Sequence, residues 1–315
     1  LDGQPAAGSG VFDYALCNRL PPYLPVVMWG GASPEQMKAT GFTHSIQWMD
    51  QLDAQAWRAG EPLGFHEAFD GLRATLDKLL VDGLRAMGKM SPGGYFESQK
   101  AYEQDRPAYF GQDRDGRSTD TVNMALPRLQ QFAYDTGRTI ANNVAMYPAV
   151  DLVISDSEFR DGGKLSFRPE DREAFRAYAG YDIPAGITTK GGVKYDRIAG
   201  FPADRIIPDD DPVLTFYRWI WGGGDGYAGF LSQARRGLND AGRPLRVYWD
   251  PVVRCASKWG SGGEVDLVGH WTYVYPDPLV MGLATDEVMA MAKGGPSYQQ
   301  PSKMTQIIWY RSGTT

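Results

Sequence analysis

The sequence contains few of the residues from which proteins build metal centres and covalent cross-links. Only two cysteines, Cys17 and Cys255, and three histidines occur among the 315 residues. None of them lies at the spacing of a zinc site or of a CxxC motif. Because nothing in the sequence brings the two cysteines together, we expect two buried free thiols, although a pairing of the two is the alternative. Neither a metal nor another cofactor is expected.

Long apolar runs and basic clusters are also missing. No stretch reaches the roughly 18–20 apolar residues that a membrane-spanning helix needs. The formal net charge is −6 and no block of lysine and arginine occurs, so neither nucleic acid nor an anionic membrane is an expected partner. The glycine-rich stretch 222–226 follows a predicted helix, whereas a phosphate-binding loop would follow a strand, so no nucleotide site is predicted. The sequence gives no indication of the oligomeric state.

What the sequence does contain is an alternation of strand and helix patterns. Short apolar segments predict seven strands, at 25–31, 42–49, 84–90, 150–155, 245–253, 265–271 and 304–310. Helical spacing and capping residues predict a short helix after Ser33 and further helices at 69–83, 127–143, 169–178, 212–237 and 286–293. The helical region 212–237 is expected to be broken at the glycine-rich stretch 222–226. Strands that alternate with helices indicate a parallel sheet with helical crossovers.

Polar and aromatic residues stand where these predicted strands end. The strand-end residues are Trp29, Asp50, Lys89, Asp156 with Glu158, Asp250, His270 with Trp271, and Trp309 with Tyr310. Such convergence favours a (β/α)8 TIM-type barrel over a doubly wound sheet, because barrel enzymes carry their chemistry at the carboxyl ends of the strands. We expect residues 1–24 to be an irregular lead-in and residues 25–315 to form one barrel domain. The polar segment 91–123 is predicted to be a long insertion after the third strand, over the active-site face. No eighth strand is visible, so either the barrel is incomplete or a weak strand lies within 84–124 or 184–208.

Acids follow directly after the fourth predicted strand. The apolar run 150–155 ends in Asp156, Glu158 and Arg160. We interpret Glu158 as a catalytic acid and Asp156 as its partner, since residues two apart share one face of a strand. The alternative is a cluster that caps the next helix, with Arg160 as a structural ion-pair partner.

Aromatic residues are plentiful, with nine tryptophans and 17 tyrosines. Indole and phenol rings combine an apolar face with a polar edge, and they stack on sugar rings. Trp29, Trp48, Trp271 and Trp309 are predicted to form a sugar platform, although any one of them taken alone is better explained as a core residue. The full set of predicted substrate-binding residues is Trp29, Asp50, His270, Trp271, Tyr273, Trp309 and Tyr310. His270 has a structural histidine as its alternative, and His44 is expected in the core or behind the site.

Cleavage of a glycosidic bond usually requires two carboxyl groups. Asp250 closes the strand after Glu158 and is the candidate for the second one; the alternative is a cap in front of Pro251. Asp50 is a weaker candidate. Two other routes avoid a second carboxylate, namely Tyr310 as the nucleophile or attack by an N-acetyl group of the substrate.

The order of these motifs resembles the clan A (β/α)8 glycoside hydrolases, in particular the family 42 β-galactosidase type. In that family the fourth strand ends in Asp-Asn-Glu or a close variant with Glu as acid/base, and here the stretch is Asp156-Ser157-Glu158. An aromatic helix such as 216–219 precedes the fifth strand, and an aromatic run such as 270–273 ends the sixth. The resemblance covers about residues 25 to 310 and implies the barrel, a carbohydrate substrate and the role of Glu158.

Two positions depart from this family. Ser157 stands in place of the asparagine that would bind a sugar hydroxyl. The seventh strand should end in the nucleophilic glutamate, yet Ile308 to Arg311 contains no carboxylate.

The sequence therefore predicts a glycoside hydrolase that cleaves an oligo- or polysaccharide by carboxylate acid–base catalysis. A secreted or periplasmic location is expected, because the chain begins at a leucine as if processed. The alternatives are a carbohydrate-binding barrel without catalysis, or a structural domain of a larger protein.

Overall fold

A computed structural model describes residues 24–49, 52–65, 69–98, 106–155, 164–188, 206–240, 243–249, 262–269, 271–272, 277–302 and 304–305. Within them, seven parallel strands form one curved sheet in the order β1 (Val27–Met28), β2 (His44–Trp48), β3 (Arg85–Met90), β6 (Val150–Ser155), β7 (Arg246–Trp249), β8 (Leu267–Val268) and β10 (Gln300–Pro301). The last two strands continue as the pair β9 (Trp271–Thr272) and β11 (Met304–Thr305). The predicted barrel-type fold, incomplete and with a long insertion after the third strand, is confirmed.

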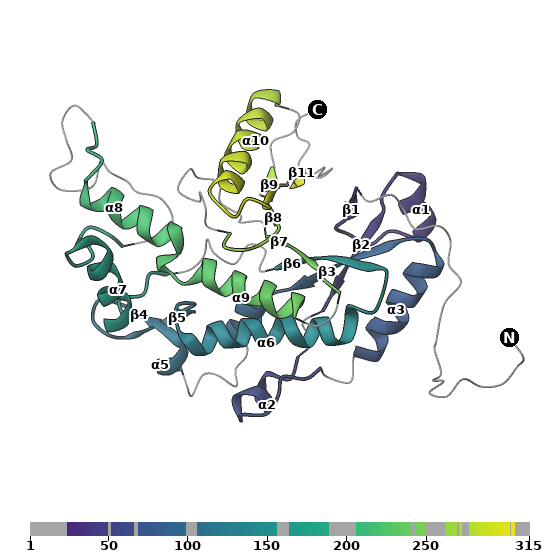
Figure 1. Ribbon diagram of the computed structural model, residues 1–315, viewed down its shortest axis with the longest axis horizontal. Coiled ribbons are helices and arrows are strands. Elements are labelled where there is room, and N and C mark those ends of the chain that lie inside the picture. Colours follow the sequence, from purple (N-terminus) through teal and green to yellow (C-terminus); the bar gives the residue numbers. More distant parts are fainter. Residues whose placement is uncertain are drawn as a thin grey trace, which may run out of the picture.

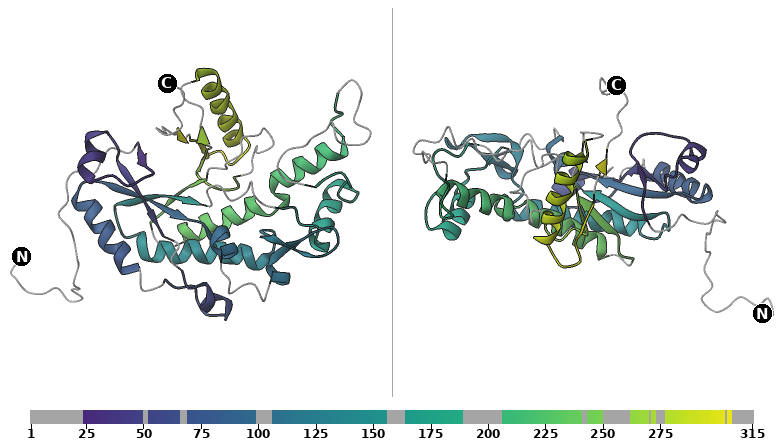
Figure 2. Two further views of the ribbon diagram at one scale, coloured as in Figure 1. Left: turned by 180° about the vertical axis from the view of Figure 1, so that it is seen from behind. Right: turned by 90° about the horizontal axis from the view of Figure 1, so that it is seen from above.

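Helices cover one face of this sheet, as Figures 1 and 2 show. They are α1 (Pro34–Ala39), α3 (Phe69–Val81), α6 (Pro127–Val144) and α9 (Tyr227–Asn239), with the short α2 (Ala54–Arg58) beside them. Side chains of the helices, such as Phe132 and Phe230, share a buried core with strand residues such as Val153 and Val247. The other face carries its own apolar cluster around Met87, Leu152, Ile154 and Tyr248. This second face is the one that points inward in a barrel.

The helices α6 and α9 touch through glycines. They run side by side in Figures 1 and 2, and their backbones meet at Gly137 and Gly237. A Cβ atom on Gly137 would lie 2.1 Å from the carbonyl oxygen of Ala234, and one on Gly237 would lie 2.0 Å from that of Tyr134. Only glycine permits this approach, so the pair fixes how the two central helices pack against the sheet.

The predicted break in the helical region 212–237 is confirmed. Helix α8 (Pro212–Trp219) passes into the π-helical turn Ile220–Gly224, and α9 starts after it. Gly223 has a φ of 128° and Gly226 a φ of 75°, values that side chains disfavour. These glycines therefore separate α8, which lies away from the sheet, from α9, which packs against it (Figure 1).

The outlying lobe is built from two segments that leave the barrel at the carboxyl ends of β3 and β6. The first contains α4 (Pro92–Ser98), α5 (Arg106–Tyr109) and the antiparallel pair β4 (Phe110–Gln112) and β5 (Ser118–Val122). The second contains α7 (Pro169–Ala179) and α8, whose Phe175 and Phe216 lie in a separate buried core. Figures 1 and 2 show this lobe at the opposite end of the molecule from α1 and α3.

A buried carboxylate joins the two segments of the lobe. The Asn123 amide donates to both Asp171 oxygens, at 3.0 and 3.2 Å. Burial raises the pKa of the Asp171 carboxyl, against the opposing effect of hydrogen bonds from Ser166 and Asn123. The insertion predicted as a polar loop thus contains a folded hairpin that is fastened to α7.

Three sequence predictions need correction. Helix α10 (Pro278–Lys293) starts eight residues before the predicted 286, because Asp277 accepts hydrogen bonds from the amides of Leu279 and Val280 and caps the helix. The strand in the seventh position of the sheet is β10, which starts at Gln300, whereas the sequence predicted this strand from residue 304. The strands within 84–124 other than β3 form the separate hairpin and do not supply an eighth barrel strand, so among the described residues β1 and β10 are both sheet edges. In the described part of the chain, no helix combines the length and apolar character needed to cross a bilayer.

Candidate functional site

Two exposed tryptophans and a lysine meet at the carboxyl ends of the first three strands. Trp48 ends β2 and lies opposite Lys89 of β3 in the sheet register, and Trp29 directly follows β1. Trp48 and Lys89 lie two residues beyond Ile46 and Met87 of the inner apolar cluster, so they share its face. The three side chains therefore lie on the inward face at the last row before the strands end.

The lysine ammonium is held against both rings. Lys89 Nζ lies 4.2 Å from the centroid of the Trp48 ring and 4.9 Å from that of Trp29. Each contact is a cation–π interaction, worth about 0.5–1 kcal/mol at an exposed position. Trp48 is 53% exposed and Trp29 is 36% exposed, so part of each side chain is accessible to solvent. A cluster of exposed aromatic surface with one fixed charge is the kind of surface that binds a small polar molecule.

The register places this cluster in a row that crosses five strands. Trp48 lies opposite Lys89, Lys89 opposite Ile154, and Ile154 opposite Tyr248. Tyr248 in turn lies opposite Leu267. Neighbouring strands are about 4.8 Å apart, so the row sets the floor of whatever site lies above it.

The predicted acids belong to the chain just beyond this row. Asp50, Asp156 and Asp250 stand two residues after Trp48, Ile154 and Tyr248, respectively. They lie outside the described residues, as does Glu158. What the structure shows is that the strands leading to Asp156 and Asp250 are hydrogen-bonded neighbours that end side by side. That these carboxylates share one pocket stays a prediction.

Most of the predicted sugar-binding residues also lie outside the described part of the chain. This applies to His270, Tyr273, Trp309 and Tyr310, whereas the backbone of Trp271 is in β9 and its side chain is not described. Of the predicted platform, the structure brings together Trp29 and Trp48. Lys89 is visible in the sequence only as a polar residue at a strand end; its position between two rings follows from the register, which no local pattern reveals.

His44 lies at the other end of the strands. It is fully buried, with Nδ1 2.7 Å from the Thr43 hydroxyl and Nε2 3.2 Å from an Asp151 carboxylate oxygen. The second oxygen of Asp151 accepts from Arg85 at 2.9 Å. These groups sit at the amino ends of β2, β3 and β6, so they stabilise the bottom of the sheet and confirm the core assignment of His44.

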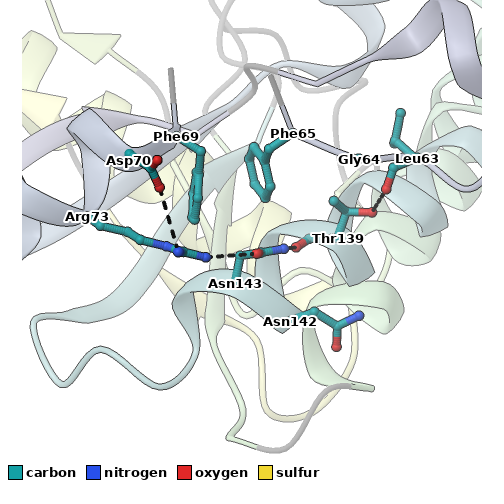
Figure 3. A pocket seen from close by; sticks show the side chains of 9 residues that line it. All are labelled: Leu63, Gly64, Phe65, Phe69, Asp70, Arg73, Thr139, Asn142 and Asn143. Carbon is teal, nitrogen blue, oxygen red and sulfur yellow. Dashed lines mark hydrogen bonds and ion pairs between the residues drawn. The ribbon is translucent and has the colours of Figure 1, made fainter. Parts of the chain in front are cut away.

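A recess of about 460 Å³ lies on the outer helical layer, away from the strand ends (Figure 3). Its wall combines the start of α3 with the last turns of α6, which lead to the amino end of β6. Phe69 is covered by the stacked Phe65 ring at 4.0 Å and by Arg73 at 4.8 Å. Arg73 also contacts Asp70 and Asn143, as the dashed lines in Figure 3 show. Because Arg73 is already engaged by Phe69, Asp70 and Asn143, and the recess lies away from the carboxyl ends of the strands, we do not place the site here.

No family model matches the chain, and no curated protein matches it in sequence. Solved structures with a similar fold are β-galactosidases. That of the psychrophilic Marinomonas ef1 is 16% identical with a TM-score of 0.51, over 76% of this chain and 38% of that one. That of Bacillus circulans sp. alkalophilus is 12% identical with a TM-score of 0.51, over 83% and 39%.

A third similar structure is a catalytic mutant of a GH42 β-galactosidase from G. stearothermophilus, 13% identical with a TM-score of 0.50, over 80% of this chain and 40% of that one. The chain therefore spans about two fifths of the length of these proteins. At such identities the likeness concerns the fold, and it confirms the predicted resemblance to the family 42 barrel at that level.

Proposed function

We propose that this barrel belongs to a glycoside hydrolase that cleaves an oligo- or polysaccharide, with Glu158 as the proton donor. The observation that carries the proposal is the inward row at the strand ends. It presents two partly exposed indole side chains and a cation, and three of its strands lead within two residues to an aspartate. Glu158 comes four residues after Ile154 of the same row.

The chemistry follows from this order. Indole rings bind the apolar face of a sugar and fix its plane. A carboxylic acid then protonates the leaving oxygen, while a second carboxylate attacks the sugar or activates water. Asp156 and Asp250, which follow neighbouring strands, are the proposed partners of Glu158. Similar proteins are β-galactosidases, so aryl β-galactosides are the first substrates to test.

A non-catalytic carbohydrate-binding barrel is the second candidate. One observation favours it: β10 and β11 contain no carboxylate, and neither does the sequence from 306 to 311. The Trp29–Trp48 platform would serve such a protein equally well. Turnover distinguishes the two functions, and sugar binding is common to both.

The test compares hydrolysis of nitrophenyl β-glycosides by the wild type and by Trp48→Ala. Trp48→Ala removes one stacking contact with the sugar, worth about 1–1.5 kcal/mol. This loss is expected to lower kcat/KM roughly tenfold. Met146→Ala is the control, because Met146 is 76% exposed but lies before β6, at the amino end of the sheet. Unchanged kcat/KM in Trp48→Ala would remove the platform from the account. Absence of hydrolysis together with tight sugar binding would favour the binding barrel.

A further inference from the structure

The inward face of β3 carries two cations with different surroundings. Arg85 and Lys89 lie four residues apart on the same face of the strand, at its two ends. Arg85 is paired with Asp151 at 2.9 Å. Within the described part of the chain, Lys89 makes no ion pair, and its ammonium contacts the rings of Trp29 and Trp48 instead. The chain as a whole has a net charge of −6, so a cation without an ion-pair partner among the described residues is a local feature of these strand ends.

The two rings hold this ammonium in place without accepting conventional hydrogen bonds from its N–H groups. An ammonium has three N–H donors, and a ring face neutralises none of the charge. A lysine is otherwise a mobile, strongly hydrated cation, and holding it in place reduces the entropy lost when a ligand binds. The Trp48 and Trp29 ring centroids lie 4.2 and 4.9 Å from the charge, so a sugar that contacts either ring has its substituents close to the ammonium.

We propose that the Trp29–Lys89–Trp48 cluster is a subsite for a carboxylate-bearing sugar, that is, a uronic acid residue. The sugar ring lies on an indole and its carboxylate pairs with Lys89. This inference rests on the proposed function and names its substrate class. The cluster lies over β1, β2 and β3, whereas Asp250 follows β7, three strand positions from β2. Lys89 itself is on β3, two strand positions from β7, so at about 4.8 Å per strand the bound carboxylate is roughly 10 Å from that strand end.

The experiment uses two non-hydrolysable probes that differ only in the sixth carbon. They are para-nitrophenyl β-D-thiogalactoside and the corresponding thiogalactosiduronate, titrated into the full chain by calorimetry. The wild type is expected to bind the uronate about tenfold more tightly at low salt, and the ratio is expected to fall toward about two at roughly 0.5 M salt, where charges are screened beyond a few ångströms. In Lys89→Met the ratio falls to about one, because only the uronate loses an ion pair.

Two further variants control for structure and for net charge. Lys89→Arg keeps the cation and is expected to keep a preference for the uronate. Lys78→Met removes a lysine from α3, whose side chain is 70% exposed, and is expected to leave the ratio unchanged. If the wild type binds the uronate no more tightly than the neutral probe, or if Lys89→Met leaves the ratio of the two affinities unchanged, the inference is overturned. In either case, binding of the neutral probe still supports the proposed function. Failure of both probes to bind the wild type overturns the inference and the proposed function together.

Discussion

Replacing Glu158 with glutamine is expected to lower kcat about a thousandfold and to change sugar affinity by no more than a few-fold. A positioned general acid contributes roughly 10²–10⁴ to the rate, and glutamine keeps its shape and hydrogen bonds but cannot supply a proton. An interaction that acts only in the transition state lowers kcat and leaves ground-state binding intact. The measurement is kcat with the best nitrophenyl glycoside, together with calorimetric binding of its thio analogue.

The leaving group supplies the internal control for this variant. A dinitrophenyl glycoside needs little protonation to depart, so Glu158→Gln is expected to recover most of its bond-cleavage rate on that substrate. Asp156→Asn and Asp250→Asn are the companion variants, since the second carboxylate cannot be bypassed in the same way. Full turnover in Glu158→Gln on the ordinary substrate would exclude Glu158 as the acid. Loss that is equal on both substrates would give it a different role.

Replacing Gly137 with alanine is expected to destabilise the protein by about 3 kcal/mol or more. The added Cβ would lie 2.1 Å from the carbonyl oxygen of Ala234, which is backbone and cannot rotate away. Relief requires α6 and α9 to separate, and forced overpacking of a core costs about 1–3 kcal/mol even when side chains can adjust. The measurement is the free energy of unfolding in urea, compared at equal m-value.

Gly71→Ala is the matched control for this substitution. Gly71 also lies within a helix, α3, but a Cβ there meets no atom within 4 Å. The same change is therefore expected to stabilise the protein by about 0.5–1 kcal/mol, because alanine restricts the unfolded chain. Equal, small effects of both substitutions would show that α6 and α9 do not pack through their backbones.

Local sequence patterns suffice for much of this fold because its strands are buried on both faces. The run 150–155 is mostly apolar, and several helices of the fold start at capping residues such as Ser33 and Asp211. The glycines after Ile220 mark the turn between lobe and barrel for the same local reason. The sequence does not reveal the early start of α10, because its first five residues, Pro278 to Gly282, are apolar or glycine and resemble a loop or strand; the Asp277 cap is the signal that marks the helix start.

The candidate site was less accessible to sequence reasoning. Tryptophans at strand ends predict a platform, but the sequence cannot say which strands are neighbours, and a Trp at a strand end is equally common in a core. Only the register of β2 against β3 brings Lys89 between Trp48 and Trp29. The hairpin within the insertion was missed because β4 and β5 are short and polar and are stabilised by contacts with distant segments, such as the Phe167 amide that donates to the Gln112 carbonyl at 2.7 Å.

The central claim is that a sugar binds on the inward face at the carboxyl ends of the strands, beside Glu158. A crystal structure of Glu158→Gln with a bound oligosaccharide measures this directly. The account predicts a sugar ring stacked on Trp48 or Trp29, a polar group of that sugar within hydrogen-bonding distance of Lys89 Nζ, and the residue 158 side chain at a glycosidic oxygen. Sugar density confined to the recess between α3 and α6, with the two tryptophans bare, would contradict it.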